Sequence, residues 1–181
     1  MHPWHDVYID EHLLEHAFPV VIEVPKGSTN KYELDKETGL LKLDRVLYSA
    51  VYYPANYGFV PRSFCDDGDP LDALVLSQEP VHPLTIVEAR PVACMRMRDD
   101  KGLDDKVIAV NASDPFYEDV KDLKDLPGHT LRQMKRFFQD YKILENKEVV
   151  VDEFIGLDET LEVLREALGM YRKLRRGELV R

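Results

Sequence analysis

The chain has 181 residues, 44% hydrophobic and 32% charged, which is typical of one globular domain that buries a sizeable core. Its formal net charge of −10 argues against general affinity for nucleic acid or anionic membranes. The polar start is not typical of a signal peptide, no apolar run approaches the roughly 18 residues of a membrane span, and two cysteines fit a reducing compartment. We therefore expect a single cytoplasmic domain over residues 1–181.

Strands dominate the first two thirds of the chain. A short helix is expected over residues 6–16, and residues 51–64 are expected to form short strand pieces and loops. The turn chemistry of Asp35–Gly39 predicts a hairpin between two of the strands. The candidate strands are Val20–Val24, Lys31–Leu34, Leu40–Leu47, Asp72–Leu76, Thr85–Met97 and Lys106–Val110.

Two helices are predicted near the end of the chain. Apolar residues spaced by three and four predict a helix from about Pro127 to Leu144, followed by a strand over 147–154. A last helix is expected over about 158–176, with Asp158 as its N-cap. Since strands come first and helices last, the order is not βαβ. We predict a mainly β fold, a small antiparallel β-barrel with flanking α-helices.

Two acidic turns stand out between the predicted strands. The first places Asp66, Asp67, Asp69 and Asp72 within seven positions, and the second covers residues 99–105. An acidic surface turn accounts for either one alone, because Asp, Gly and Pro are common turn residues. Two like charges at 4 Å repel by about 4 kcal/mol at an effective dielectric near 20, so converging carboxylates would require cations.

Charged residues also fall on strand faces that are otherwise apolar. Residues two apart on a strand share a face, which aligns Arg45 with Leu43 and Lys106 with Ile108. Any one such charge is explained by snorkelling at a strand end. Several together, beside two acidic turns, predict a polar pocket for metal ions and a phosphate-like ligand. Oxygen ligands without a matching His/Cys set favour Mg²⁺ or Mn²⁺ over zinc.

Other site types compete with this interpretation. His12-Leu13-Leu14-Glu15-His16 matches the H-x-x-E-H pattern of some zinc peptidases, which requires both histidines on one helix. The acidic turns fail the EF-hand spacing, and the chain has no GxxxxGK[ST] loop. A small barrel could also bind single-stranded nucleic acid, but it would then need a basic groove with stacking aromatic residues.

The order of the motifs resembles that of the soluble family I inorganic pyrophosphatases of the prokaryotic type. The family signature D-x-D-P-x-D stands here as Asp67-Gly68-Asp69-Pro70-Leu71-Asp72. The resemblance covers about residues 18–145. The further motifs are Val21-Ile22-Glu23, Lys31-Tyr32-Glu33, Asp44-Arg45, Tyr53-Pro54-Ala55-Asn56-Tyr57-Gly58, Asp99…Asp104-Asp105-Lys106 and Phe137-Phe138-Gln139-Asp140-Tyr141-Lys142.

The resemblance implies an OB-fold-like barrel, assembled as a homohexamer, that hydrolyses pyrophosphate supplied as a magnesium complex. By carry-over, Asp69 would accept the proton of the attacking water, with Asp66 and Asp105 as solvated neighbours. One departure is Asp100, where many members have Glu. The implied metal ligands are Asp67, Asp72, Asp99 and Asp104, with Glu23 and Glu33 in the outer shell. The implied phosphate-binding residues are Lys31, Arg45, Tyr57, Lys106, Tyr141 and Lys142, supported by Tyr53.

Overall fold

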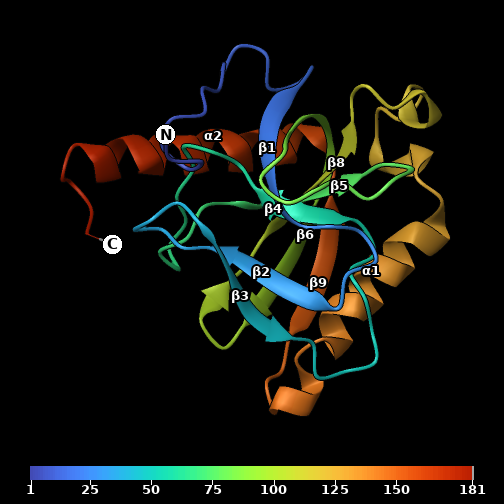
Figure 1. Cartoon of the computed structure of the whole chain (residues 1–181). Helices are drawn as coiled ribbons and strands as arrows, with labels where there is room; N and C mark the ends of the chain where they lie inside the picture. Colours follow the sequence, from blue (N-terminus) through green and yellow to red (C-terminus); the bar gives the residue numbers. More distant parts are fainter. Residues whose placement is uncertain (181) are drawn as a thin grey trace.

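The structure is a computed structural model that describes residues 1–180 (Figure 1). Five strands pair around a closed ring in the order β1, β4, β5, β8, β6 and back to β1. Their bounds are β1 Phe18–Val24, β4 Asn56–Phe59, β5 Asp72–Leu76, β8 Lys106–Asn111 and β6 Ile86–Asp99. The expected mainly β fold with helices outside it is therefore confirmed.

One pairing in the ring is parallel, so the expectation of a wholly antiparallel barrel is wrong there. Strand β5 pairs with β8 in parallel, from Asp72 opposite Lys106 to Leu76 opposite Val110, whereas the other pairs in the ring are antiparallel. Strand directions cannot alternate all the way round a closed ring with an odd number of strands. The two parallel strands begin with Asp72 and Lys106, which are both predicted site residues.

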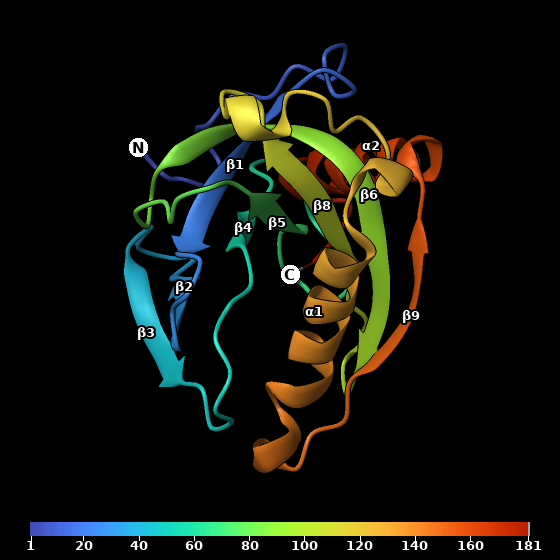
Figure 2. The same cartoon turned by 90° about the vertical axis from the view of Figure 1, so that its right-hand side faces the viewer.

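The remaining elements flank this ring. Strands β2 (Asn30–Leu34) and β3 (Leu41–Val46) form a separate hairpin, while β7 (Gly102–Leu103) and β9 (Val150–Ile155) pair with the long β6. Helices α1 (Gly128–Asp140) and α2 (Leu157–Arg175) complete the fold, together with short 3₁₀ helices at Pro115–Tyr117, Leu123–Asp125 and Ile143–Glu145. The hairpin and α1 both lie below the ring (Figure 2). No helix within residues 1–180 combines the length and apolarity that crossing a membrane requires.

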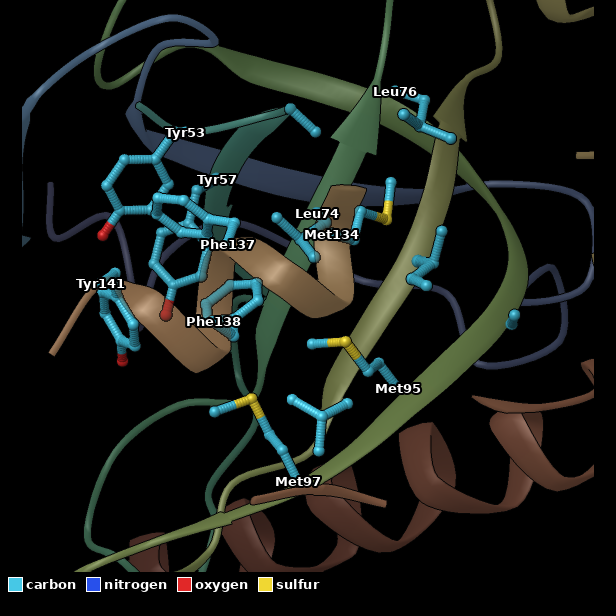
Figure 3. Close-up of a cluster of buried hydrophobic side chains, with 14 of the residues drawn as sticks. Tyr53, Tyr57, Leu74, Leu76, Met95, Met97, Met134, Phe137, Phe138 and Tyr141 are labelled. Atoms are coloured by element: carbon cyan, nitrogen blue, oxygen red, sulfur yellow. The ribbon is translucent and has the colours of Figure 1, made fainter. Parts of the chain in front are cut away.

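Both faces of the central strands are buried, which explains their continuous apolar sequences. Alternation directs Leu74 and Leu76 of β5 toward α1, while Ala73 and Val75 face the cluster that contains residues of α2. The cluster on the α1 side is rich in aromatic residues and methionines (Figure 3). Its labelled members are Tyr53, Tyr57, Leu74, Leu76, Met95, Met97, Met134, Phe137, Phe138 and Tyr141.

The predicted strands appear within a few residues of their expected bounds, but the helix expected over 6–16 is wrong. That segment forms turns, in which the Asp10 carboxylate accepts a hydrogen bond from the backbone N–H of His12 at 3.0 Å. Such a side-chain acceptor competes with helical hydrogen bonding. The N-cap of α2 is Gly156 and not Asp158, which lies in the first turn. Helix α1 is shorter than expected and ends at Asp140.

A substitution at Gly58 of β4 tests how closely β4 approaches β1 in the ring. A Cβ atom there would lie 2.0 Å from the carbonyl oxygen of Val21 and 2.8 Å from the Cα of Ile22, both in β1. Because backbone atoms cannot move aside as a flexible side chain can, we expect Gly58→Ala to lower the free energy of unfolding by about 3 kcal/mol or more. Urea unfolding followed by circular dichroism measures this loss.

The matched control is Gly169→Ala in α2, where the nearest atom to an added Cβ is a guanidinium nitrogen of Arg172 at 3.6 Å. Alanine is the better helix former by up to about 1 kcal/mol, so this variant should be at least as stable as the wild type. A Gly58→Ala protein that unfolds at the wild-type urea concentration would contradict the close approach of β4 to β1.

Candidate active site

One polar cavity of about 130 Å³ gathers residues from distant parts of the chain. They come from β1, β2, β4, β5 and β8, from both acidic turns and from the end of α1. The lining contains seven carboxylates and five lysines. Twelve of the residues predicted from the sequence lie there: Glu23, Lys31, Glu33, Tyr57, Asp67, Asp69, Asp72, Asp99, Asp104, Lys106, Tyr141 and Lys142.

Two predicted residues lie outside this lining. Tyr53 is buried behind it, with its ring centroid 5.3 Å from that of Tyr57 and 4.7 Å from that of Phe137. The guanidinium of Arg45 contacts the carboxylate of Asp44 and donates from Nε to Glu145 Oε2 at 3.1 Å. Arg45 is thus held by acidic neighbours beside the cavity.

The lining also contains two lysines that the sequence pattern did not predict, Lys36 and Lys101. Both lie in turns, where the alternation of a strand gives no signal about which way a side chain faces. Lys36 follows Asp35 in the turn of the β2–β3 hairpin, and Lys101 lies within the second acidic turn. Their position in the cavity follows only from the folded chain, which brings these turns close to the ring.

Lys106 is the central cation of the cavity. Its side chain is 2% exposed, and its Nζ lies 2.6 Å from both Asp72 Oδ2 and Asp104 Oδ1. Burial opposes the charge, but Asp104 and Asp72 raise the pKa of Lys106 well above its usual value. The rings of Tyr57 and Phe138 flank the ammonium, with centroids at 5.6 and 5.5 Å. Lys106 therefore stays charged and compensates both carboxylates.

The environments of the acidic residues differ. Burial raises the pKa of Glu23 to about 8, against a hydrogen bond of 2.7 Å that its carboxylate accepts from the Leu34 N–H. Burial, then the charges of Asp72 and Asp104, raises the pKa of Asp67 to about 6. Asp99 shows the opposite shift: despite burial, hydrogen bonds from the Lys101 N–H and from Lys142 lower its pKa.

Lysine contacts hold most of the lining carboxylates. Lys142 Nζ lies 3.0 Å from Asp99 Oδ2, Lys31 contacts Glu33, and Lys36 contacts Asp69. Carboxylates still outnumber lysines, so the cavity attracts cations and would repel a bare polyanion. This balance argues against the nucleic-acid-binding alternative, which needs a basic groove.

The donor set suits a hard cation. Oxygen donors line the cavity without His or Cys, the chemistry that Mg²⁺ prefers. Within the described part of the chain, no three His, Cys, Asp or Glu side chains are arranged so that they could hold a metal ion together. The ammonium of Lys106 stands between Asp72 and Asp104, so a cation shared by these two would require Lys106 to shift.

Several other acidic residues and the histidine motif lie elsewhere. Asp66 and Asp100 are outside the lining. Asp105 is not the solvated neighbour expected: it is partly buried, and its Oδ1 has no hydrogen-bond partner among residues 1–180. His12 and His16 lie in turns and not on a helix, which removes the geometry that the zinc-peptidase alternative needs.

The fold and the cavity define a mainly β protein whose ring of strands carries a site of carboxylates and lysines, as expected of an enzyme that handles phosphates with metal ions. Comparisons with known proteins name the family. The family model for inorganic pyrophosphatase matches residues 20–172. The chain therefore belongs to the inorganic pyrophosphatase family, a family of hydrolases.

The relatives found by sequence and those found by structure are inorganic pyrophosphatases. The chain is 52% identical over 172 residues to soluble inorganic pyrophosphatase 2 of Chlamydomonas reinhardtii, covering 95% of this chain and 89% of that protein. The crystal structure of inorganic pyrophosphatase from Thermus thermophilus has a TM-score of 0.88 at 41% identity, covering 92% of this chain and 97% of that one. The enzyme from Helicobacter pylori has the same TM-score at 45% identity, covering 92% and 99%.

A substitution of Lys106 tests whether its ammonium compensates the carboxylates of Asp72 and Asp104. Lys106→Met leaves Asp72 and Asp104 facing each other in a buried site, so we expect a loss of about 3–5 kcal/mol in the free energy of unfolding, measured in urea with EDTA. The control is Lys101→Met, an exposed lysine of the same cavity, with an expected change within about 0.5 kcal/mol. Equal urea midpoints for the two variants would contradict the compensating role of Lys106.

Proposed function

We propose that the chain hydrolyses inorganic pyrophosphate to two phosphates, with the substrate entering as its magnesium complex. The observation that carries this proposal is the convergence of Asp67, Asp69, Asp72, Asp99 and Asp104 with lysines in one cavity, in a chain that belongs to the inorganic pyrophosphatase family. The excess of carboxylates over lysines explains why the substrate would have to bring cations with it.

The carboxylates would share the metal ions. Asp67, Asp72 and Asp104 would hold one Mg²⁺ and Asp72 a second, while Asp99 and Asp104 would hold an ion that arrives with the substrate. Glu23 and Glu33 would lie in the outer shell, and Mn²⁺ is the expected substitute. When bound, such ions lower the pKa of water and draw negative charge from the phosphoryl oxygens.

The side chains of the cavity supply the rest of the chemistry. Asp69, whose side chain is 38% exposed, would take the proton from the water that attacks phosphorus in line with the leaving phosphate. Because little covalent work is required of the protein, charge neutralisation and positioning dominate phosphoryl transfer. The cationic residues proposed to neutralise the phosphates are Lys31, Arg45, Lys106 and Lys142.

Two tyrosines would donate neutral hydrogen bonds to the phosphates. Burial raises the pKa of Tyr57 and of Tyr141 above the usual value of a phenol, so both hydroxyls keep their protons at neutral pH. The rings lie together with those of Tyr53, Phe137 and Phe138 at one end of the aromatic cluster (Figure 3). Packing in this cluster would hold the two donors in place and keep bulk water away.

The proton acceptor provides the direct test of the proposed function. We expect Asp69→Asn to lower phosphate release from magnesium pyrophosphate by about 100-fold to 10,000-fold, because an amide cannot accept the proton. The control Asp66→Asn changes an exposed neighbour outside the cavity and should keep wild-type activity. Wild-type protein that releases no phosphate, or a fully active Asp69→Asn variant, would refute the proposal.

The assembly and the compartment form a second part of the proposal. We expect a homohexamer in the cytoplasm, and exposed apolar side chains such as Leu43, Tyr48 and Tyr52, each more than half exposed, are consistent with an interface between subunits. Size-exclusion chromatography with light scattering measures the mass of the particle. A monomer at micromolar concentration would contradict the assembly and leave the proposed activity unaffected.

A further inference from the structure

Lys36 joins the hairpin to the proposed proton acceptor. Its Nζ contacts Asp69 Oδ1 inside the cavity, and its side chain is 23% exposed. Lys36 was not among the residues that the family motifs identified.

The turn that carries Lys36 is well ordered by its own hydrogen bonds. Asp35 Oδ1 accepts from the backbone N–H and the hydroxyl of Thr38, both at 2.8 Å, and from the Glu37 N–H at 3.2 Å. Gly39 closes the turn with a φ of 73°, a left-handed conformation that glycine adopts without strain. The ammonium of Lys36 is thus presented from a rigid support.

Residues 2–5, called here the N-terminal strap, connect this turn to the segment that carries Asp69. On one side, His2 Nε2 lies 3.1 Å from the carbonyl oxygen of Lys36. On the other, Trp4 Nε1 donates to the carbonyl oxygen of Ser63 at 2.8 Å, and the Trp4 side chain is fully buried. The hydroxyl of Ser63 in turn accepts from the Leu71 N–H at 2.8 Å, so Ser63, just before the first acidic turn, links the strap to Leu71 within that turn.

We propose that Lys36 is a positioning residue for Asp69. Its ammonium fixes the orientation of the carboxylate, and the N-terminal strap keeps the hairpin turn and the acidic turn at a constant separation. The inference rests on the proposed function, in which Asp69 accepts the proton of the attacking water. A carboxylate free to rotate is misaligned for much of the time, and a misplacement of about 1 Å can cost about 100-fold in rate.

The kinetic test compares Lys36→Met with Lys36→Arg. We expect Lys36→Met to lower kcat about 10-fold to 100-fold with little change in KM, because proton transfer suffers and substrate binding does not. Lys36→Arg keeps the positive charge and should recover most of the lost rate. Lys42→Met, an exposed lysine on the same hairpin, is the control and should match the wild type.

Combining the variants separates positioning from other roles. In an Asp69→Asn background, Lys36→Met should cause no further loss of kcat, because the group that it positions is already gone. His2→Ala should reproduce a smaller part of the Lys36→Met defect in the wild-type background and none in the Asp69→Asn background. Circular dichroism and urea midpoints confirm that each variant is folded.

Three outcomes would overturn this inference: an unchanged kcat in Lys36→Met, an increase in KM alone, or a Lys36→Met loss that persists in the Asp69→Asn background. Each leaves the proposed function intact, provided that the wild type releases phosphate and that Asp69→Asn releases it about 100-fold or more slowly. Failure of the wild type to hydrolyse pyrophosphate would instead refute the proposed function itself. The two failures are therefore distinguishable.

Discussion

The ammonium of Lys106, held between the carboxylates of Asp72 and Asp104, is the interaction on which the site depends. Asp72 and Lys106 begin the two parallel strands of the ring and are paired in register, so the backbone itself brings them together. A closed ring of five strands requires at least one parallel pair. The parallel pair of the ring is therefore also the pair that brings the two charges together at the centre of the cavity.

Burial on both sides makes this arrangement rigid. Residues of β5 and β8 alternate between the cluster that includes α1 and the cluster that includes α2, so neither strand has a solvent face along which it could shift register. At the start of each strand the apolar pattern gives way to a charge, and these charges meet beside Tyr57 and Phe138. The apolar packing thereby fixes where a costly group of charges can be tolerated.

The lysines explain how so many carboxylates coexist in one small cavity. Each of the lysine contacts to Asp72, Asp99, Asp104 and Asp69 offsets part of the mutual repulsion of these carboxylates. In the proposed reaction the contacts to Asp72, Asp99 and Asp104 would be exchanged for contacts with cations and phosphates, whereas the contact of Lys36 with Asp69 would remain. Lys36 differs from the others, since it is delivered by a turn that the N-terminal strap supports from outside the ring.

The sequence by itself predicted the strands, the two long helices and twelve of the residues that line the cavity, because strand alternation and the order of the family motifs can be read along the chain without its fold. It also predicted a helix over 6–16 and missed Lys36. In the first case a hydrogen bond that the Asp10 carboxylate accepts from the His12 N–H competed with helical hydrogen bonding. Only the tertiary structure decided that β5 and β8 run in parallel and that a hairpin turn reaches Asp69, since both depend on which distant segments meet when the ring closes.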